Sequence, residues 1–397
     1  MIKIIDKAKC CGCTSCASAC PQMAISMLPD EEGFMYPKIS TTLCVDCGLC
    51  ETVCPILNGY HKELVKKAYV VRAKEESILK DSTSGGAFTI LVQEILQNNG
   101  VVFGVAFDEK FKVKHSWIDG QLEELGGFRG SKYVQSSIGE TFNKVKEFLD
   151  CRKQVLFSGT PCQIAGLNNY LRKEYENLLT VEVVCHGVTS PKLWDKYLEY
   201  QTAIYKSDPK KIKFRNKTYG YHSGTMEIVF ENGLTYHGSA RVDLMLKSFF
   251  SEIASRPSCY FCVMRGRERA ADISIFDAWH AGKLSEEIKD DDKGYTNLLI
   301  NSKKGRHFME KVMSKCIIHE ISADLAIRLD GSMICQQPHM HERRFEFYRE
   351  VNTSGIKSAI EKYIPISKRD VAIEHFKRAL YKTGLLNAMK IIVKGDK

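Results

Sequence analysis

The feature that most constrains the fold of this chain is a run of cysteines that occurs twice near its beginning. The segment "CCGCTSCASACP" spans residues 10–21, and "CVDCGLCETVCP" spans residues 44–55. In each segment, four cysteines follow one another at intervals of 3, 3 and 4 residues, and a proline comes directly after the last. The chain has 16 cysteines among 397 residues, but disulfide-dense frameworks belong mainly to small secreted domains. The pattern therefore favours metal ligation over disulfide bonds.

The spacing of each run, C-x2-C-x2-C-x3-C-P, is typical of cysteines that wrap a 4Fe–4S cluster. In two-cluster arrangements of this kind, the fourth cysteine of each run ligates the cluster of the other run. One predicted ligand set is therefore Cys10, Cys13, Cys16 and Cys54, and the other is Cys44, Cys47, Cys50 and Cys20. A zinc ribbon is the alternative, but it needs two separated C-x2-C pairs, which the doubled run fits poorly. We expect Cys11 to be a neighbouring thiol and not a ligand.

Composition and charge limit the class of protein. Hydrophobic residues make up 44% of the chain and charged residues 26%, which is ordinary for a globular protein with two or three domains. The sequence has no apolar stretch of about twenty residues and no signal-like start, so we expect a cytoplasmic protein without a membrane span. The formal charge is +9, but the basic residues are scattered and nucleic-acid binding is not expected. Four-thiolate cluster sites carry about −2 each and would offset part of this charge.

The pattern changes after a polar connector, "NGYHKELVKKA", that begins at residue 58. Strands are predicted at 68–74, 101–107, 154–157 and 179–184, and helices at 84–100, 138–149 and 161–175. This β–α–β alternation favours a largely parallel sheet. An Asn-Gly turn in "MEIVFENGLTYHG" predicts one hairpin. The expected class is mixed α/β, with a two-cluster ferredoxin domain over 1–58, an α/β domain over 66–320 and a helical region over 321–397.

Further cysteines lie where open α/β sheets place their ligand sites, at the carboxyl ends of strands. Cys162 follows the strand at 154–157, and Cys185 follows the strand at 179–184. Far along the chain, "RPSCYFC" adds the pair Cys259 and Cys262 at chelating spacing. These four residues form a candidate third metal centre. The alternatives are that Cys162 and Cys185 are small apolar core residues, or that Cys162 is a nucleophile activated by His186.

The order of several motifs resembles the coenzyme F420 hydrogenase/dehydrogenase beta-subunit family over roughly residues 66–305. The motifs are "SGGAFTILVQEIL", "VVFGVAF", "GSKYVQS", "SGTPCQIAGL", "VVCHG", "SCYFC", "ADISIFDAW" and "GYTNLLINS". The resemblance implies that Cys162, Cys185, Cys259 and Cys262 hold one 4Fe–4S cluster and that the fold binds FAD beside it. In its fusion to a bacterial-type two-cluster ferredoxin, the chain resembles bacterial members of this family, which are often encoded near polysaccharide-synthesis genes.

The resemblance also suggests flavin-binding and proton-transfer residues. The predicted flavin contacts are Ser84, Gly85, Gly86, Lys132, Tyr133 and Thr160. Small residues at a helix N-terminus let backbone N–H groups meet a pyrophosphate, although the two glycines also suit a plain turn. The proton-transfer candidates are Asp277 and His280 at the end of a short strand, with His186 as a competing choice. The basic run of Arg265, Arg267 and Arg269 is a candidate for binding an anionic group, or a solvated turn.

These features together predict an iron–sulfur flavoprotein oxidoreductase with three 4Fe–4S clusters and FAD. Iron–sulfur clusters transfer one electron at a time, and a flavin can store two and transfer them as hydride. The combination therefore couples one-electron transfer to two-electron chemistry. The expected partners are a ferredoxin-type carrier and a small-molecule substrate. The C-terminal helices are expected to pack over the core or against another subunit. Two alternatives remain open: an electron-transfer protein without a substrate of its own, and an enzyme that uses coenzyme F420 itself.

Overall fold

The computed structural model describes residues 1–120 and 122–386, and these residues separate into two compact units. The first unit contains residues 1–129, 134–192 and 255–339. The second contains residues 130–133, 193–254 and the chain from 340 onward. All cysteines of the sequence belong to the first unit. Within the described ranges, no helix combines the length and the apolar character needed to cross a membrane.

The two cysteine runs form a small module at the start of the first unit. Strands β1 (Ile25–Pro29) and β2 (Met35–Ile39) pair as an antiparallel hairpin between the runs. Each run contains a one-turn helix, α1 (Ser15–Ser18) in the first and α2 (Leu49–Thr52) in the second. The apolar core of the module is very small and consists largely of cysteines. A core of this size gives little stability, so ligation of the thiols is the expected source of the module's fold.

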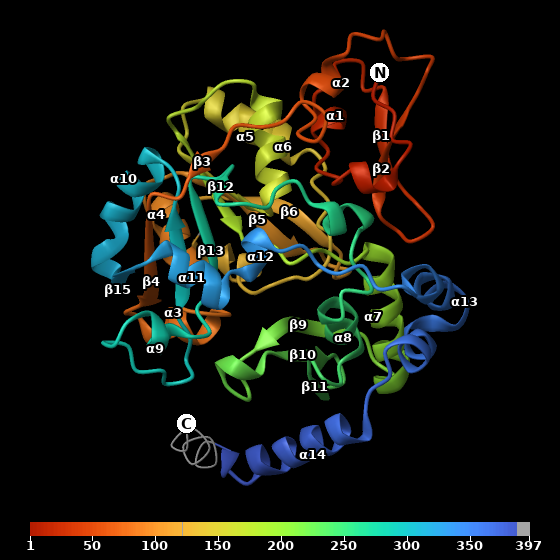
Figure 1. Ribbon diagram of the computed structural model, residues 1–397, viewed down its shortest axis with the longest axis vertical. Helices are drawn as coiled ribbons and strands as arrows, with labels where there is room; N and C mark the ends of the chain where they lie inside the picture. The colour runs from red at the N-terminus through yellow and green to blue at the C-terminus, as the bar shows by residue number, and fades with distance from the viewer. Residues whose placement is uncertain (121, 387–397) are drawn as a thin grey trace. The chain divides into compact units, whose positions relative to one another are not determined.

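An eight-stranded mixed sheet forms the centre of the first unit, in the order β15-β4-β14-β13-β8-β7-β5-β6 (Figure 1). The strands are β4 (Lys67–Ala73), β5 (Val101–Phe107), β6 (Val113–Asp119), β7 (Val155–Gly159), β8 (Leu178–Val183), β13 (Ile273–Asp277), β14 (Thr296–Ile300) and β15 (Cys316–Ile321). The central run β13-β8-β7-β5 is parallel, and the outer strands pair antiparallel. Because β14 is antiparallel to both neighbours, β4 runs in the same direction as β13. The carboxyl ends of β4, β5, β7, β8 and β13 therefore share one edge of the sheet.

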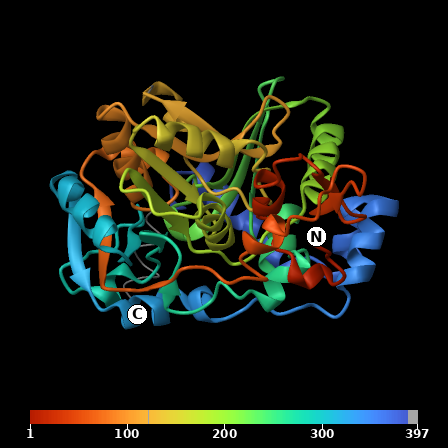
Figure 2. The ribbon, with the colours of Figure 1, turned by 90° about the horizontal axis from the view of Figure 1, so that it is seen from above.

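Helices cover both faces of this sheet (Figure 2). Alternate residues of a strand point to opposite faces, and β5 illustrates this: Val102 packs in one core, and Val101 and Phe103 pack in the other. The first core uses α4 (Ala87–Gln97) and α10 (Lys303–Val312), and the second uses α5 (Thr141–Asp150) and α6 (Pro161–Leu171). The remaining helices of this unit are α3 (Glu76–Asp81), α9 (Ala281–Leu284), α11 (Ala323–Asp330) and α12 (Ser332–Cys335).

The N-terminal module is attached to this sheet domain within the first unit. Helix α1 lies against α6 and α5 (Figure 1). The connector pairs as β3 (Glu63–Leu64) with β12 (Glu268–Arg269). Before β3, the Tyr60 hydroxyl donates to the carbonyl of Val263 at 3.2 Å. The connector is therefore held by backbone pairing and side-chain hydrogen bonds.

Among its described residues, the second unit contains a three-stranded antiparallel sheet and four α-helices. Its strands are β9 (Pro209–Asn216), β10 (Thr225–Phe230) and β11 (Thr235–Ser239). Its helices are α8 (Leu244–Phe250), α13 (Arg344–Tyr363), α14 (Lys368–Lys382) and most of α7 (Pro191–Tyr205). The Asn-Gly hairpin predicted from the sequence is the β10–β11 pair. Helix α13 has a non-helical residue at Gly355, where φ is +88°.

The mixed α/β class predicted from the sequence is confirmed. The strand predicted at 68–74 is β4, and the helix predicted at 84–100 is the shorter α4. The two predicted β–α–β repeats correspond to β5-α5-β7 and β7-α6-β8. The helix predicted near the C-terminus corresponds to α14, and residues 387–395 of that segment lie outside the described residues.

Candidate iron–sulfur and flavin sites

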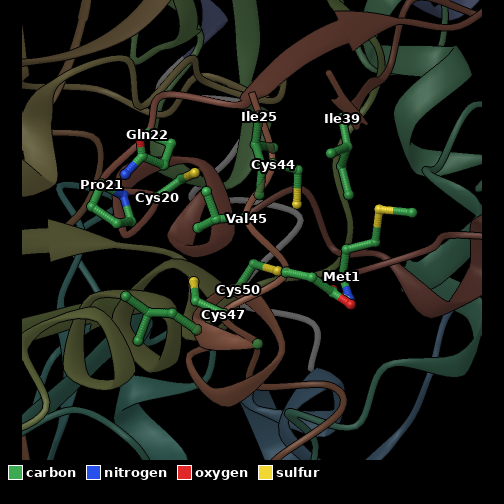
Figure 3. Close-up of a pocket in the computed structure, with 13 residues that line it drawn as sticks. Met1, Cys20, Pro21, Gln22, Ile25, Ile39, Cys44, Val45, Cys47 and Cys50 are labelled. Carbon is green, nitrogen blue, oxygen red and sulfur yellow. The ribbon is translucent and has the colours of Figure 1, made fainter. Parts of the chain in front are cut away.

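Cys20, Cys44, Cys47 and Cys50 line one pocket in the N-terminal module, which we call the outer ferredoxin site (Figure 3). Two backbone N–H groups donate to its sulfur atoms, Ala24 to Cys20 at 3.3 Å and Ile2 to Cys50 at 3.4 Å. Hydrogen bonds to thiolates are one of the factors that set cluster potentials. Cys47 is exposed, so this site lies at the surface of the module.

The other four cysteines of the runs form a second group, the inner ferredoxin site: Cys10, Cys13, Cys16 and Cys54. Burial raises the pKa of Cys16, and repulsion from Cys13, Cys10 and Cys54 raises it further. Burial also raises the pKa of Cys10, with smaller contributions from Cys13 and Cys54. Burial thus opposes ionisation of Cys10 and Cys16, and a cationic partner such as iron would hold them as thiolates.

The two groups are the ones that the crossed ligation pattern predicts. In each group, three cysteines come from one run and the fourth comes from the end of the other. Among the residues that the structure describes, no three His, Cys, Asp or Glu side chains converge on a position for a single metal ion. A 4Fe–4S cluster instead uses one thiolate at each of four corner irons. The donor set fits such clusters, and their presence remains a prediction.

A third group of cysteines lies at the carboxyl edge of the sheet, which we call the sheet-edge site. Cys162 is in the first turn of α6 after β7, and Cys185 follows β8. Cys259 lies in the 3-10 helix η4 (Pro257–Phe261), and Cys262 directly follows it. Burial raises the pKa of Cys185, and the charges of Cys259 and Cys162 raise it further. Burial likewise raises the pKa of Cys259 to about 12, with contributions from Cys262 and Cys162.

Polar side chains contact two of the residues of the sheet-edge site. The Thr160 hydroxyl is 3.2 Å from the sulfur of Cys162. The Arg265 guanidinium donates to the carbonyl of Cys185 at 2.8 Å. Thr160, which the sequence suggested as a flavin contact, therefore contacts a predicted cluster ligand. Its backbone N–H donates to the side chain of Gln163 at 2.9 Å, which closes the first turn of α6.

Cys11 lies between the inner ferredoxin site and the sheet-edge site. Its thiol lies close to those of Cys13 and Cys162, and interaction with these two thiols raises its pKa. The same contacts lower the pKa of Cys162 and lower that of Cys13 to about 6. The sequence carried no signal for this role, because Cys11 falls outside the ligand spacing.

The predicted flavin residues of the first unit lie at the same sheet edge. Ser84, Gly85 and Gly86 precede α4, and Gly85 N–H donates to the Thr296 hydroxyl at 2.9 Å. Packing explains both glycines: a Cβ on Gly85 would collide with the carbonyl oxygen of Val71, and Gly86 has φ of +86°. A larger residue at either position would disturb the fold directly, so such variants do not test flavin binding.

Lys132 and Tyr133 belong to the second unit. The Tyr133 ring stacks on Phe249, with centroids 4.2 Å apart. Desolvation lowers the pKa of Lys132 to about 7. A bound anion would raise the pKa of Lys132 again and so stabilise the charged form of its side chain. Their participation in flavin binding remains a prediction.

His280 is held by a buried carboxylate. Its Nδ1 is 2.7 Å from Oδ1 of Asp330, whose side chain is fully buried at the end of α11. Asn297 donates to both Asp330 and the carbonyl of Asp277, at 3.1 and 3.0 Å. Asn297 therefore joins the backbone of Asp277 to the carboxylate that holds His280. Asp330 was missed in the sequence, because it lies 50 residues from His280.

The three arginines of the basic run have different environments. Arg265 faces the sheet-edge site. Arg267 pairs with Asp324 at 2.5 Å on the surface. Arg269 is buried and pairs with Glu182 at 2.5 Å. His186, the competing proton donor, follows Cys185 and is half-buried.

Two segments of the chain match known protein families. Residues 152–324 match the family described as the C terminus of the beta subunit of coenzyme F420 hydrogenase/dehydrogenase. Residues 9–57 match the 4Fe-4S dicluster domain, so the protein is an iron–sulfur protein of the electron-transfer type.

Relatives of this chain include proteins of Methanocaldococcus and Methanosarcina species. The protein MJ1349 of Methanocaldococcus jannaschii is 24% identical over 81% of this chain and 92% of its own length. The F subunit of the F420H2 dehydrogenase of Methanosarcina mazei is 22% identical over 41% of this chain and 48% of its own length. A solved chain of the F420-reducing NiFe hydrogenase complex from Methanosarcina barkeri has a TM-score of 0.46 and 18% identity, over 68% of this chain and 89% of that chain.

The resemblance read from the motifs is thereby confirmed for residues 152–324, which are similar to the C terminus of the beta subunit of coenzyme F420 hydrogenase/dehydrogenase, and both N-terminal cysteine runs lie in a segment that matches the 4Fe-4S dicluster domain.

Proposed function

We propose that this protein is a cytoplasmic iron–sulfur flavoprotein oxidoreductase that exchanges electrons with a ferredoxin-type carrier and acts on an organic substrate. The observation that carries the proposal is the placement of three cysteine groups within one compact unit, with Cys11 close to a predicted ligand of two of them. When bound, 4Fe–4S clusters supply one-electron transfer and FAD supplies two-electron chemistry.

The residues of each site support a distinct role. The outer ferredoxin site includes the exposed Cys47, which suits exchange with an external carrier. The inner ferredoxin site is buried and contacts the sheet-edge site through Cys13, Cys11 and Cys162. The three groups therefore form a series from the surface to the sheet edge.

The sheet edge suits the organic reaction. The N-terminus of α4 lies at this edge beside Thr296, and backbone N–H groups at a helix N-terminus favour phosphate. His280 follows β13 at the same edge, and its ring is 44% exposed. Asp330 orients the ring and leaves Nε2 for a proton exchange with substrate. We infer that His280 is the proton donor of the flavin half-reaction.

Purification under anaerobic conditions, followed by metal and flavin analysis, tests the proposal. We expect about twelve iron and twelve acid-labile sulfide per chain, from three four-iron sites, and release of FAD on extraction. Reduced ferredoxin should then reduce the bound flavin. About eight irons would contradict the sheet-edge cluster, tightly bound zinc would contradict the cluster chemistry, and protein without flavin would contradict the oxidoreductase proposal.

A second function is favoured by the relative named as part of a dehydrogenase. In this alternative, the chain transfers electrons to a partner enzyme and has no substrate of its own, or it passes electrons directly between the ferredoxin-type carrier and coenzyme F420. Spectral bleaching of coenzyme F420 by the purified protein would establish the second case. Reduction of the flavin without turnover of any small molecule, together with capture of a redox partner protein, would establish the first.

A further inference from the structure

Arg256 is a fully buried arginine in the loop that leads to Cys259. Its side chain is 0% exposed, and its polar contacts all reach groups near the cysteine runs. Nε donates to the carbonyl of Cys10 at 2.8 Å, and Nη2 donates to the carbonyl of Met35 at 3.0 Å. Nη1 donates to the side-chain oxygen of Gln135 at 2.8 Å. The amide of Gln135 in turn donates to the carbonyl of Cys11 at 3.3 Å.

The charge of Arg256 lacks the usual compensation. A buried guanidinium is normally paired with a carboxylate, because removing an unpaired charge from water is costly. Arg269 of the same unit follows this rule, with Glu182 at 2.5 Å. Arg256 has only carbonyl and amide acceptors among the described residues. Its other neighbours are the rings of Tyr36 and Phe34, with centroids 4.2 and 5.4 Å from the guanidinium carbon.

Arg256 contacts the loops of two different cysteine groups. Its Nε donates to the carbonyl of Cys10 in the inner ferredoxin site. Its own carbonyl accepts a hydrogen bond from the backbone N–H of Cys259 in the sheet-edge site, at 2.9 Å. Arg265, by contrast, donates to the carbonyl of Cys185, which belongs to the sheet-edge site alone. The two arginines therefore differ in the number of cysteine groups that they face.

We propose that Arg256 is the shared counter-charge of the inner ferredoxin and sheet-edge clusters, and that it raises the reduction potential of both. The inference rests on the proposed function, because it requires clusters at both sites. A reduced cluster carries one more negative charge than an oxidised one, so a fixed cation between two clusters favours reduction of each. Arg256 is a positioning residue in this role, and it also ties the loop of Cys10 to the loop of Cys259.

The test is a redox titration of the holoprotein, followed by electron paramagnetic resonance, with iron analysis of every sample. Signals are assigned to sites through Cys162→Ala, which removes the sheet-edge cluster. Arg256→Gln should lower the equilibrium constant for one-electron reduction of both the inner and the sheet-edge cluster by about tenfold, or about 59 mV. The outer cluster should keep its potential. Arg265→Gln should shift the sheet-edge cluster alone, and the exposed control Arg306→Gln should shift none.

Two further variants cover the case in which Arg256→Gln does not fold. Gln135→Glu places a carboxylate at the acceptor of Nη1 and neutralises the guanidinium without removing it, so both potentials should fall in the same way. Arg256→Lys keeps the charge and should leave both potentials within about threefold of the wild-type equilibrium. Unchanged potentials in a fully loaded Arg256→Gln or Gln135→Glu protein would overturn the inference. Wild-type protein with fewer than about twelve irons would instead overturn the proposed function on which it rests.

Discussion

Gly166 of α6 is in close contact with the N-terminal module, so Gly166→Ala is a direct test of how the module is held. The Ser15 hydroxyl donates to the carbonyl of Gly166 at 2.7 Å. A Cβ on Gly166 would lie 2.6 Å from that hydroxyl oxygen and 2.8 Å from Cβ of Cys13. Contacts this short force either α6 or the loop of Cys13 to move. Cys13 is a predicted cluster ligand, so its loop has little freedom to do so.

The expected cost follows from three opposing effects. Alanine is favoured over glycine in a helix interior by about 1 kcal/mol. Overpacking a well-packed contact costs about 1–3 kcal/mol, and loss of the buried Ser15 hydrogen bond costs about 1 kcal/mol. We therefore expect Gly166→Ala to lower the free energy of unfolding by about 1–3 kcal/mol, although alanine is the better helix former.

The assay is anaerobic chemical denaturation of the holoprotein, monitored by circular dichroism and by cluster absorbance. The matched control is Gly282→Ala in α9, where the nearest atom to a new Cβ is 3.4 Å away; this variant should be neutral or slightly stabilised. We also expect reduced ferredoxin to reduce the flavin more slowly in Gly166→Ala, because the contact of Cys13 and Cys162 through Cys11 is disturbed. A Gly166→Ala protein as stable as the wild type, with unchanged kinetics, would refute the reasoning.

Three other predictions address the sites separately. Cys162→Ser should lose about four of about twelve irons, while the N-terminal cluster signals persist. The control Cys151→Ser, at an exposed cysteine, should lose none. Iron analysis and electron paramagnetic resonance measure both, and the reverse pattern would reject the sheet-edge assignment. Desolvation lowers the pKa of Lys132 to about 7, so its side chain is charged below that pH. FAD affinity should therefore weaken as the pH rises above 7. Titration calorimetry from about pH 6 to about pH 8.5 should show this decrease of affinity with pH in the wild type and not in Lys132→Met. His280→Gln should slow substrate turnover about a hundredfold and Asp330→Asn less, while cluster potentials stay constant; equal rates in His280→Gln would remove it as the proton donor.

The sequence alone was sufficient for the features that depend on local spacing. The doubled run predicts two ligand sets, because a cluster requires thiols at fixed short intervals along the chain. The alternation of strands and helices predicts the α/β class and locates Cys162 and Cys185 after neighbouring parallel strands. Strand direction then brings these two residues to one edge without any knowledge of the packing.

Tertiary structure decided the contacts that join distant segments. Arg256 reaches Cys10 across 246 positions in the sequence, and neither residue carries a periodic or spacing signal that indicates the other. The same holds for Asp330 and His280. The sequence shows Gly85 and Gly86 only as two flexible residues. The packing shows that the carbonyl oxygen of Val71 leaves no room for a side chain at Gly85. Local sequence patterns indicate the periodicity of helices and strands and the spacing of residues that ligate a cluster. The partners of a buried charge, by contrast, depend on the packing of the whole unit.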